Sequence, residues 1–149
     1  MVSATADSIG WTVRLDGGWE MARARVSANR PWERVVGYSR AVRAGTVIEV
    51  SGTAPADAEG RILAPGDVYG QTRESLRIIG EALGELGAGF ADVVRTRILL
   101  ADVTRWEEAG RAHGEVFSEI RPANTTMGVA GFVDPEILVE VEVTAVIEP

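Results

Sequence analysis

The segment from residue 138 to residue 145 constrains the fold more than any other part of the chain, because it alternates apolar and polar side chains. Successive side chains of a β-strand point to opposite faces, so Glu140, Glu142 and Thr144 share one face and the valines between them share the other. The valine face can be buried against helices, whereas the carboxylate face needs water, a partner subunit or a ligand. We therefore expect a sheet covered on one side, with the functional site near its polar face.

Two helices are predicted by apolar residues that recur at spacings of three and four. The first pattern runs from Val68 to Leu86, after Asp67 as a suitable N-cap. The second begins at Asp102 or Thr104, and its apolar stripe includes Trp106, which is predicted to lie in the core. The strand patterns cover residues 11–15, 39–43, 46–50, 61–63, 93–100, 124–129 and 137–147.

This order of elements predicts an α+β fold, with one mixed sheet and two helices packed on one face. Helices on one face leave the polar face open, and a homo-oligomer that encloses it is a natural solution. We expect one domain over residues 21–149, preceded by an extension of residues 1–20 that is either an added strand or a flexible tail.

Composition excludes several classes of function. The chain has no Cys, one His and no Lys, which excludes disulfides and Schiff-base catalysis and leaves no metal site of the usual kind. The net charge of -7 argues against a nucleic-acid partner. No apolar run approaches the roughly 18 residues of a membrane span, and the start lacks a signal-peptide pattern, so a cytoplasmic protein without a membrane partner is expected. No glycine pattern indicates a nucleotide cofactor, and no cofactor is expected.

Several short phrases occur in an order that points to a known family. They are Gly37-Tyr38-Ser39-Arg40-Ala41-Val42, Val50-Ser51-Gly52-Thr53, Gln71-Thr72-Arg73, Asp92-Val93-Val94-Arg95-Thr96, Leu100-Ala101-Asp102, Arg121-Pro122-Ala123 and Val139-Glu140-Val141-Glu142. With these phrases the chain resembles the Rid family, also called YjgF or L-PSP, from about Val35 to Ile147. The resemblance implies a chorismate-mutase-like fold and a compact homotrimer with ligand pockets between subunits. It also implies hydrolysis of reactive imines or enamines to keto acids and ammonia.

The same resemblance implies which residues form the site. Glu140 matches a pocket glutamate that helps to position or activate water, and it is the candidate catalytic residue. Tyr38 matches a pocket tyrosine, and Ser51 and Gly52 lie at a strand end where backbone N–H groups can face a ligand. Thr125 matches a small hydroxyl residue that can bind a ligand or the local backbone.

The chain departs from the family at the residue that binds the substrate carboxylate. Family members have an Arg two residues after the Pro of a Pro-Ala-Arg-Ser phrase, and this chain has Asn124 there. An Arg clamps a carboxylate with two charged hydrogen bonds, whereas an amide offers only uncharged donors, so the loss would cost about 1.5–3 kcal/mol of binding. Arg97 and Arg121 are the candidate replacements for the lost charge.

Two alternative functions remain open from the sequence. The pocket can have been reassigned to another hydrolysis, cyclisation or isomerisation, which Asn124 favours, or the protein can be a non-catalytic trimer that binds a metabolite or a protein. RNA cleavage, an older label of the family, is disfavoured by the acidic balance. Glu142 and His113 are expected to be structural, and His113 to be packed or at an interface.

Overall fold

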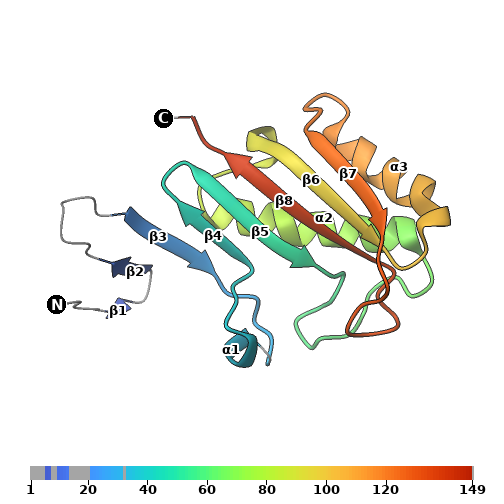
Figure 1. Cartoon of the computed structure of the whole chain (residues 1–149), viewed down its shortest axis with the longest axis horizontal. Coiled ribbons are helices and arrows are strands. Elements are labelled where there is room, and N and C mark those ends of the chain that lie inside the picture. The colour runs from blue at the N-terminus through green and yellow to red at the C-terminus, as the bar shows by residue number, and fades with distance from the viewer. Residues whose placement is uncertain (1–5, 8–9, 14–20, 32, 149) are drawn as a thin grey trace.

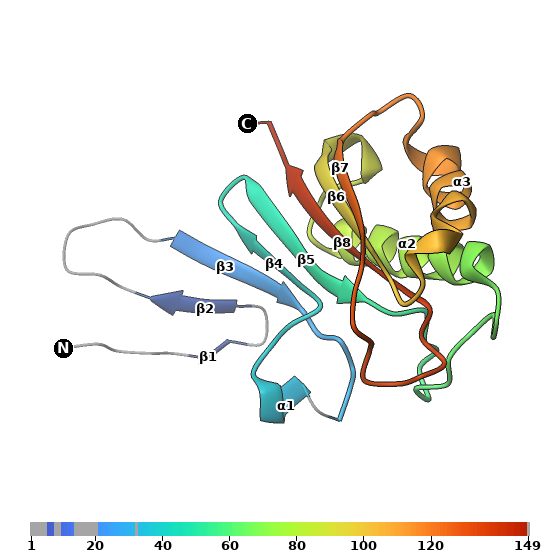
Figure 2. The same ribbon diagram turned by 45° about the vertical axis from the view of Figure 1, so that its right-hand side comes forward.

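The computed structural model describes residues 6, 7, 10–13, 21–31 and 33–148, which form two layers. One layer is a mixed β-sheet. The other is a pair of helices, α2 (Val68–Glu85) and α3 (Trp106–Phe117), which lie side by side on the same face of the sheet (Figures 1 and 2). The predicted α+β class, with two helices on one face, is confirmed.

Eight strands in the order β1-β2-β3-β4-β5-β8-β6-β7 make up the sheet. Every neighbouring pair is antiparallel except β6 and β7, which run parallel. The strands are β1 (Ala6–Asp7), β2 (Gly10–Val13), β3 (Met21–Val26), β4 (Ala41–Ala44), β5 (Val47–Thr53), β6 (Val93–Leu100), β7 (Ala123–Gly128) and β8 (Val139–Val146). A short helix, α1 (Glu33–Val36), joins β3 to β4, and the 3-10 turns Phe90–Asp92 and Val103–Arg105 precede β6 and α3.

The core lies between the sheet and the two helices. Val139, Val141 and Val143 of β8 are at most 1% exposed, whereas Glu140 and Glu142 lie half-buried on the opposite face. The apolar stripe predicted for α2 faces this core, since Val68, Thr72, Leu76, Ile79, Leu83 and Leu86 are all buried. The two-faced terminal strand is therefore confirmed.

Helix α2 begins and ends as the sequence predicts. The carboxylate of Asp67 accepts a hydrogen bond from the backbone N–H of Gly70 at 2.9 Å, which caps the first turn. After Leu86, Gly87 takes a φ of +80°, a conformation that favours glycine, and the chain leaves the helix there.

Two local predictions were wrong. Residues 61–63 do not form a strand, because only Ile62 pairs there, in an isolated bridge with Ala56. Trp106 is not in the core of this chain: it is the first residue of α3 and is 54% exposed, with its ring about 3.8 Å from the position a Cβ on Gly110 would take.

Neither β3 nor α1 was predicted from the sequence. Strand β3 pairs with β4, and β2 pairs with β3 on the other side, so the described residues before Met21 extend the sheet by two strands. The expected strand at 11–15 overlaps β2 over residues 11–13, and its last two residues lie outside the described ranges. The domain boundary at residues 20 and 21 stays a prediction.

Candidate functional site

A break in the pairing of β5 with β8 opens the site. The register between these strands is regular up to Val50 and shifts before Thr53, so Ser51 and Gly52 form an irregularity where β5 bends. The buried guanidinium of Arg40 lies against this bend. Its Nη1 donates to the Gly52 carbonyl at 3.0 Å, to Thr53 Oγ1 at 2.9 Å and to Ser51 Oγ at 3.2 Å. Polar groups that the broken ladder leaves unpaired are thereby satisfied.

The carboxyl group of Glu140 lies directly over Gly52. A Cβ built on Gly52 would be 2.6 Å from Glu140 Oε2, so only glycine leaves the carboxyl group in this position. Burial raises the pKa of Glu140, and the negative charge of Glu142 raises it further, while the positive charge of Arg40 opposes the shift. A carboxyl group with a raised pKa can both accept and return a proton near neutral pH.

Glu140 faces a pocket with a volume of about 100 Å³. Tyr38, Gly52 and Glu140 are brought together here as expected. Ser51 does not line the pocket, but its hydroxyl donates to the backbone carbonyl of Arg40, which does. The other walls come from the loop before β4, the segment that follows β5 and the loop that precedes β8. The complete lining is Arg30, Tyr38, Arg40, Gly52, Ala54, Ala56, Gly60, Ile62, Val133, Asp134, Ile137 and Glu140.

Buried polar contacts hold the loops that line this pocket. Gln71 of α2 is fully buried, and its amide donates to the Glu136 carbonyl at 2.9 Å and accepts from the Leu138 N–H at 2.8 Å. These two bonds hold the segment that leads into β8 and therefore help to set the position of Glu140 in the pocket. Arg30 holds the opposite loop by donating to the carbonyls of Ala56 and Asp57.

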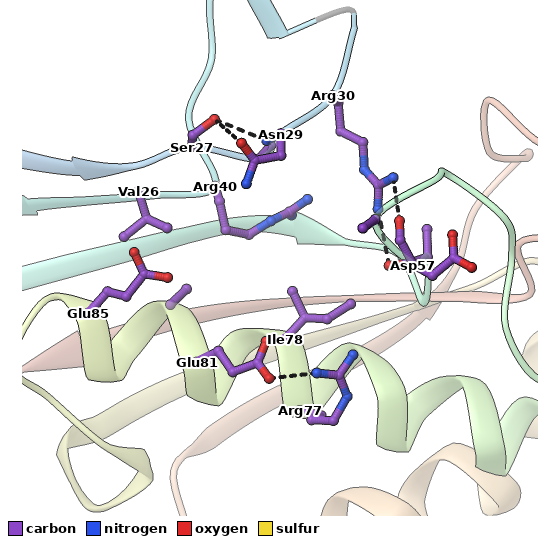
Figure 3. Close-up of a pocket in the computed structure, with 14 residues that line it drawn as sticks. Val26, Ser27, Asn29, Arg30, Arg40, Asp57, Arg77, Ile78, Glu81 and Glu85 are labelled. Atoms are coloured by element: carbon purple, nitrogen blue, oxygen red, sulfur yellow. Dashed lines mark hydrogen bonds and ion pairs between the residues drawn. The ribbon is translucent and has the colours of Figure 1, made fainter.

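A larger cavity of about 330 Å³ adjoins the first. Figure 3 shows Arg40 between the loop that follows β3 and the helix α2, which contributes Glu81 and Glu85. Within it, Arg77 pairs with Glu81 at 2.6 Å. Arg30, Arg40 and Ala56 line both cavities, so the buried guanidinium of Arg40 forms part of the wall between them.

The remaining predicted binding residues lie elsewhere in the chain. Arg97 forms an ion pair with Glu142 at 3.2 Å, and Thr125 accepts a hydrogen bond from Arg95 at 2.8 Å, both on the polar face of the sheet. Arg121 is exposed, with a φ of +56°, where α3 leads into β7. None of these predicted residues lines the pocket of Glu140 in a single chain, and their part in binding stays a prediction.

Asn124 belongs to a hydrogen-bonded network on the helix side of β7. Its Nδ2 donates to Thr96 Oγ1 at 3.0 Å, and its Oδ1 accepts from Thr126 Oγ1 at 2.9 Å. Thr96 Oγ1 also lies 2.8 Å from Nε2 of His113, which packs against Phe117. Burial lowers the pKa of His113, which favours the neutral ring. His113 is therefore packed, as expected.

Arg40 is the functional candidate that sequence reasoning did not single out. The residue belongs to one of the family phrases and directly follows Tyr38-Ser39. An Arg in a segment that alternates polar and apolar residues is usually exposed to solvent, so the sequence did not indicate that it is buried. Its burial depends on the bend in β5, which no local pattern announces. Arg30 was not predicted either, because it lies in an irregular loop.

Neither a metal centre nor a membrane span is evident within the described ranges. No group of three or more His, Asp or Glu side chains in that part of the chain is arranged to hold a metal ion. No helix there is long and apolar enough to cross a membrane.

The two-layer fold defines an α+β protein with a pocket beside a distorted strand of its sheet. Residues 28–147 match the family described as Endoribonuclease L-PSP, and the chain belongs to this family, whose members are also called YjgF, RutC or Rid proteins. The family resemblance and the fold type expected from the sequence are thereby confirmed. The family is typically homotrimeric.

Three relatives show how broad this similarity is. A crystal structure of Rv2704 from Mycobacterium tuberculosis, of the YjgF/YER057c/UK114 family, is 43% identical, covers 84% of this chain and 99% of its own, and gives a TM-score of 0.75. An uncharacterized protein of Streptomyces coelicolor is 40% identical over 81% of this chain and 90% of its own. The rat 2-iminobutanoate/2-iminopropanoate deaminase is 31% identical over 72% of this chain and 79% of its own.

Proposed function

We propose that this protein hydrolyses a small reactive imine, or its enamine tautomer, to a carbonyl compound and ammonia. One observation carries the proposal: the carboxyl group of Glu140 is partly desolvated and lies over a residue without a side chain, inside a pocket that remains open. The similarity to a relative named 2-iminobutanoate/2-iminopropanoate deaminase supports the same reaction class. For 2-iminobutanoate, the products are 2-oxobutanoate and ammonia.

The reaction needs one water and three proton transfers. Ionised Glu140 accepts a proton from the water as its oxygen adds to the carbon of the protonated imine, and the C=N bond becomes a C–N single bond. The protonated carboxyl then returns this proton to nitrogen. The C–N bond breaks and ammonia leaves, while the new hydroxyl group gives its proton to Glu140 and becomes the carbonyl. A group that performs both steps works best with a pKa near the operating pH, and burial moves the pKa of Glu140 in that direction.

The surrounding residues supply position rather than chemistry. Tyr38 borders the pocket and can donate its hydroxyl to a ligand, while Gly52, without a side chain, leaves room for the carboxyl group of Glu140. The proposal includes a homotrimer in the cytoplasm, in which the polar face that carries Arg97 and Thr125 meets a second subunit. Asn124 would take part in binding only through such an arrangement.

A coupled deamination assay tests the proposal. An amino-acid oxidase generates 2-iminobutanoate in place, and release of 2-oxobutanoate is followed with wild type and Glu140→Gln. We expect wild type to accelerate release above the spontaneous rate and Glu140→Gln to lose 10²–10⁴-fold of that acceleration. Equal acceleration by both proteins, or none by wild type with several imine side chains, would exclude this function and favour a reassigned or non-catalytic pocket.

A further inference from the structure

Arg40 is a buried cation that no carboxylate of the described residues contacts as an ion pair, although the charges of Glu140 and Glu33 act on it from a longer distance. Its side chain and backbone together are only 8% exposed, and none of the ion pairs within the described ranges includes it. The three acceptors of its Nη1 are a carbonyl and two hydroxyl groups, all neutral. Burying a charge without an opposite charge in direct contact is costly, so the position favours a further anion beside Arg40.

Part of the guanidinium remains available to that anion. Arginine has five N–H groups, and the bend in β5 uses only those on Nη1. Nε and Nη2 have no acceptor among the described residues. They are also absent from the enclosed, unpaired polar atoms of that part of the chain, which are Ser75 Oγ and Arg95 Nε. Since Arg40 lines the pocket of Glu140 as well as the larger cavity, its side chain borders open space in which an anion can meet these donors.

We propose that Arg40 binds the carboxylate of the substrate in the pocket of Glu140 and makes the protein selective for small anionic substrates. This inference rests on the proposed function and deepens it. A guanidinium can bind both oxygens of a carboxylate in one plane, which fixes the orientation of the substrate as well as its affinity. Arg30 lines the same pocket and adds a second positive charge.

The position of Arg40 also answers the departure at Asn124. The amide of Asn124 bonds to Thr96 and Thr126 on the helix side of the sheet and does not line the pocket of Glu140, so it provides no carboxylate clamp there within this chain. Arg40, which directly precedes β4, supplies a permanent positive charge instead. It lines the same pocket as Glu140, the residue that would transfer the proton. The pocket volume of about 100 Å³ suits a short-chain acid.

Two probes of nearly equal shape separate charge recognition from pocket filling. One is 2-oxobutanoate, the product of the proposed reaction, and the other is its neutral amide, 2-oxobutanamide. Binding is measured by NMR titration at low ionic strength with wild type, Arg40→Gln and Arg40→Lys, and folding is checked by thermal melting. We expect at least a tenfold loss of 2-oxobutanoate affinity in Arg40→Gln and a smaller loss in Arg40→Lys, with the amide changed less than threefold.

A second pair of variants leaves Arg40 in place. Val133 is 89% exposed and lines the pocket of Glu140, whereas Ala58 is exposed and lines only the larger cavity. Val133→Glu should weaken 2-oxobutanoate binding about two- to fivefold through repulsion that salt reduces, and Ala58→Glu should have less effect. This pair remains informative if Arg40→Gln fails to fold, because both substitutions are at surface positions.

The outcomes distinguish this inference from the proposed function. The inference is overturned if wild type does not bind 2-oxobutanoate, if Arg40→Gln binds it as wild type does, or if Ala58→Glu weakens it more than Val133→Glu. Charge-selective binding through Arg40 in a protein that accelerates no imine hydrolysis would support the inference and reject the proposed reaction. Hydrolysis that persists in Arg40→Gln with unchanged KM would do the reverse.

Discussion

Replacing Gly52 with Ala should separate catalysis from stability. The new Cβ would lie 2.6 Å from Glu140 Oε2, and ordinary contact begins at 3.4 Å, so the carboxyl oxygen must move by about 0.8 Å. Since this oxygen is the end of a flexible side chain, the movement is cheap for the fold. Gly52 also does not have a positive φ, so alanine is compatible with the backbone. The free energy of unfolding should therefore change by less than about 1 kcal/mol.

The same shift of the carboxyl oxygen should lower the rate of catalysis strongly. A displacement of about 1 Å in a positioned group can cost roughly 100-fold in rate, equivalent to about 2.7 kcal/mol in the activation barrier. We expect kcat for imine hydrolysis to fall by about that factor in Gly52→Ala, part of the way toward Glu140→Gln. The coupled assay gives the rate and urea unfolding gives the stability.

Gly84→Ala is the matched control. Gly84 lies in α2, and a Cβ there would meet nothing within 4 Å, so this variant should gain up to about 1 kcal/mol of stability with unchanged kcat. The reasoning fails if Gly52→Ala keeps wild-type kcat, since Glu140 would then not need its observed position. It also fails if the loss of activity follows a loss of folded protein.

Four further predictions concern charge and hydrogen bonding. Because the negative charge of Glu142 raises the pKa of Glu140, Glu142→Gln should move the acidic limb of the kcat/KM profile to lower pH, and an unmoved limb would contradict this. A raised pKa in the folded state favours folding below the unfolded pKa and loses that contribution as pH rises, so Glu140→Gln should melt higher than wild type at pH 7.5 but not at pH 4, as calorimetry can check. Thr96→Val should lower the free energy of unfolding, measured with urea, by about 1–3 kcal/mol, because His113 and Asn124 both lose a hydrogen-bond partner. An unchanged free energy of unfolding would show that this network does not stabilise the fold. The lowered pKa of His113 means that stability falls as the pH drops below its unfolded value of 6.5, and this fall should be smaller in His113→Phe.

Regular elements were predictable because their patterns are local. The strand at residues 93–100 and the helix after Asp67 have the expected bounds, since each has an uninterrupted period and a clear start. Strand β3 (Met21–Val26) was missed because its alternation of Ala and Arg carries little apolar signal. Trp106 was misplaced because helical spacing gives a face but does not say how deep the first turn lies.

The site was only partly predictable, for a different reason. The residue types at Tyr38, Gly52 and Glu140 follow from the family resemblance, and the structure brings these three together. The approach of Glu140 to Gly52 depends on a shifted register between strands about 90 residues apart in sequence. The burial of Arg40 depends on that same bend, so neither contact can be read from a local pattern.

The shared wall between the two cavities has a thermodynamic consequence. Arg40 and Arg30 border both spaces, so a molecule that contacts either guanidinium from the larger cavity changes the field and the free donors on the other side. Linkage is reciprocal: if occupancy of one cavity alters affinity in the other by some factor, the second ligand alters the first by the same factor. An anion in one cavity would lower the affinity of the other cavity for a second anion. Phosphate or acetate from the buffer would therefore change every anion affinity measured for this protein.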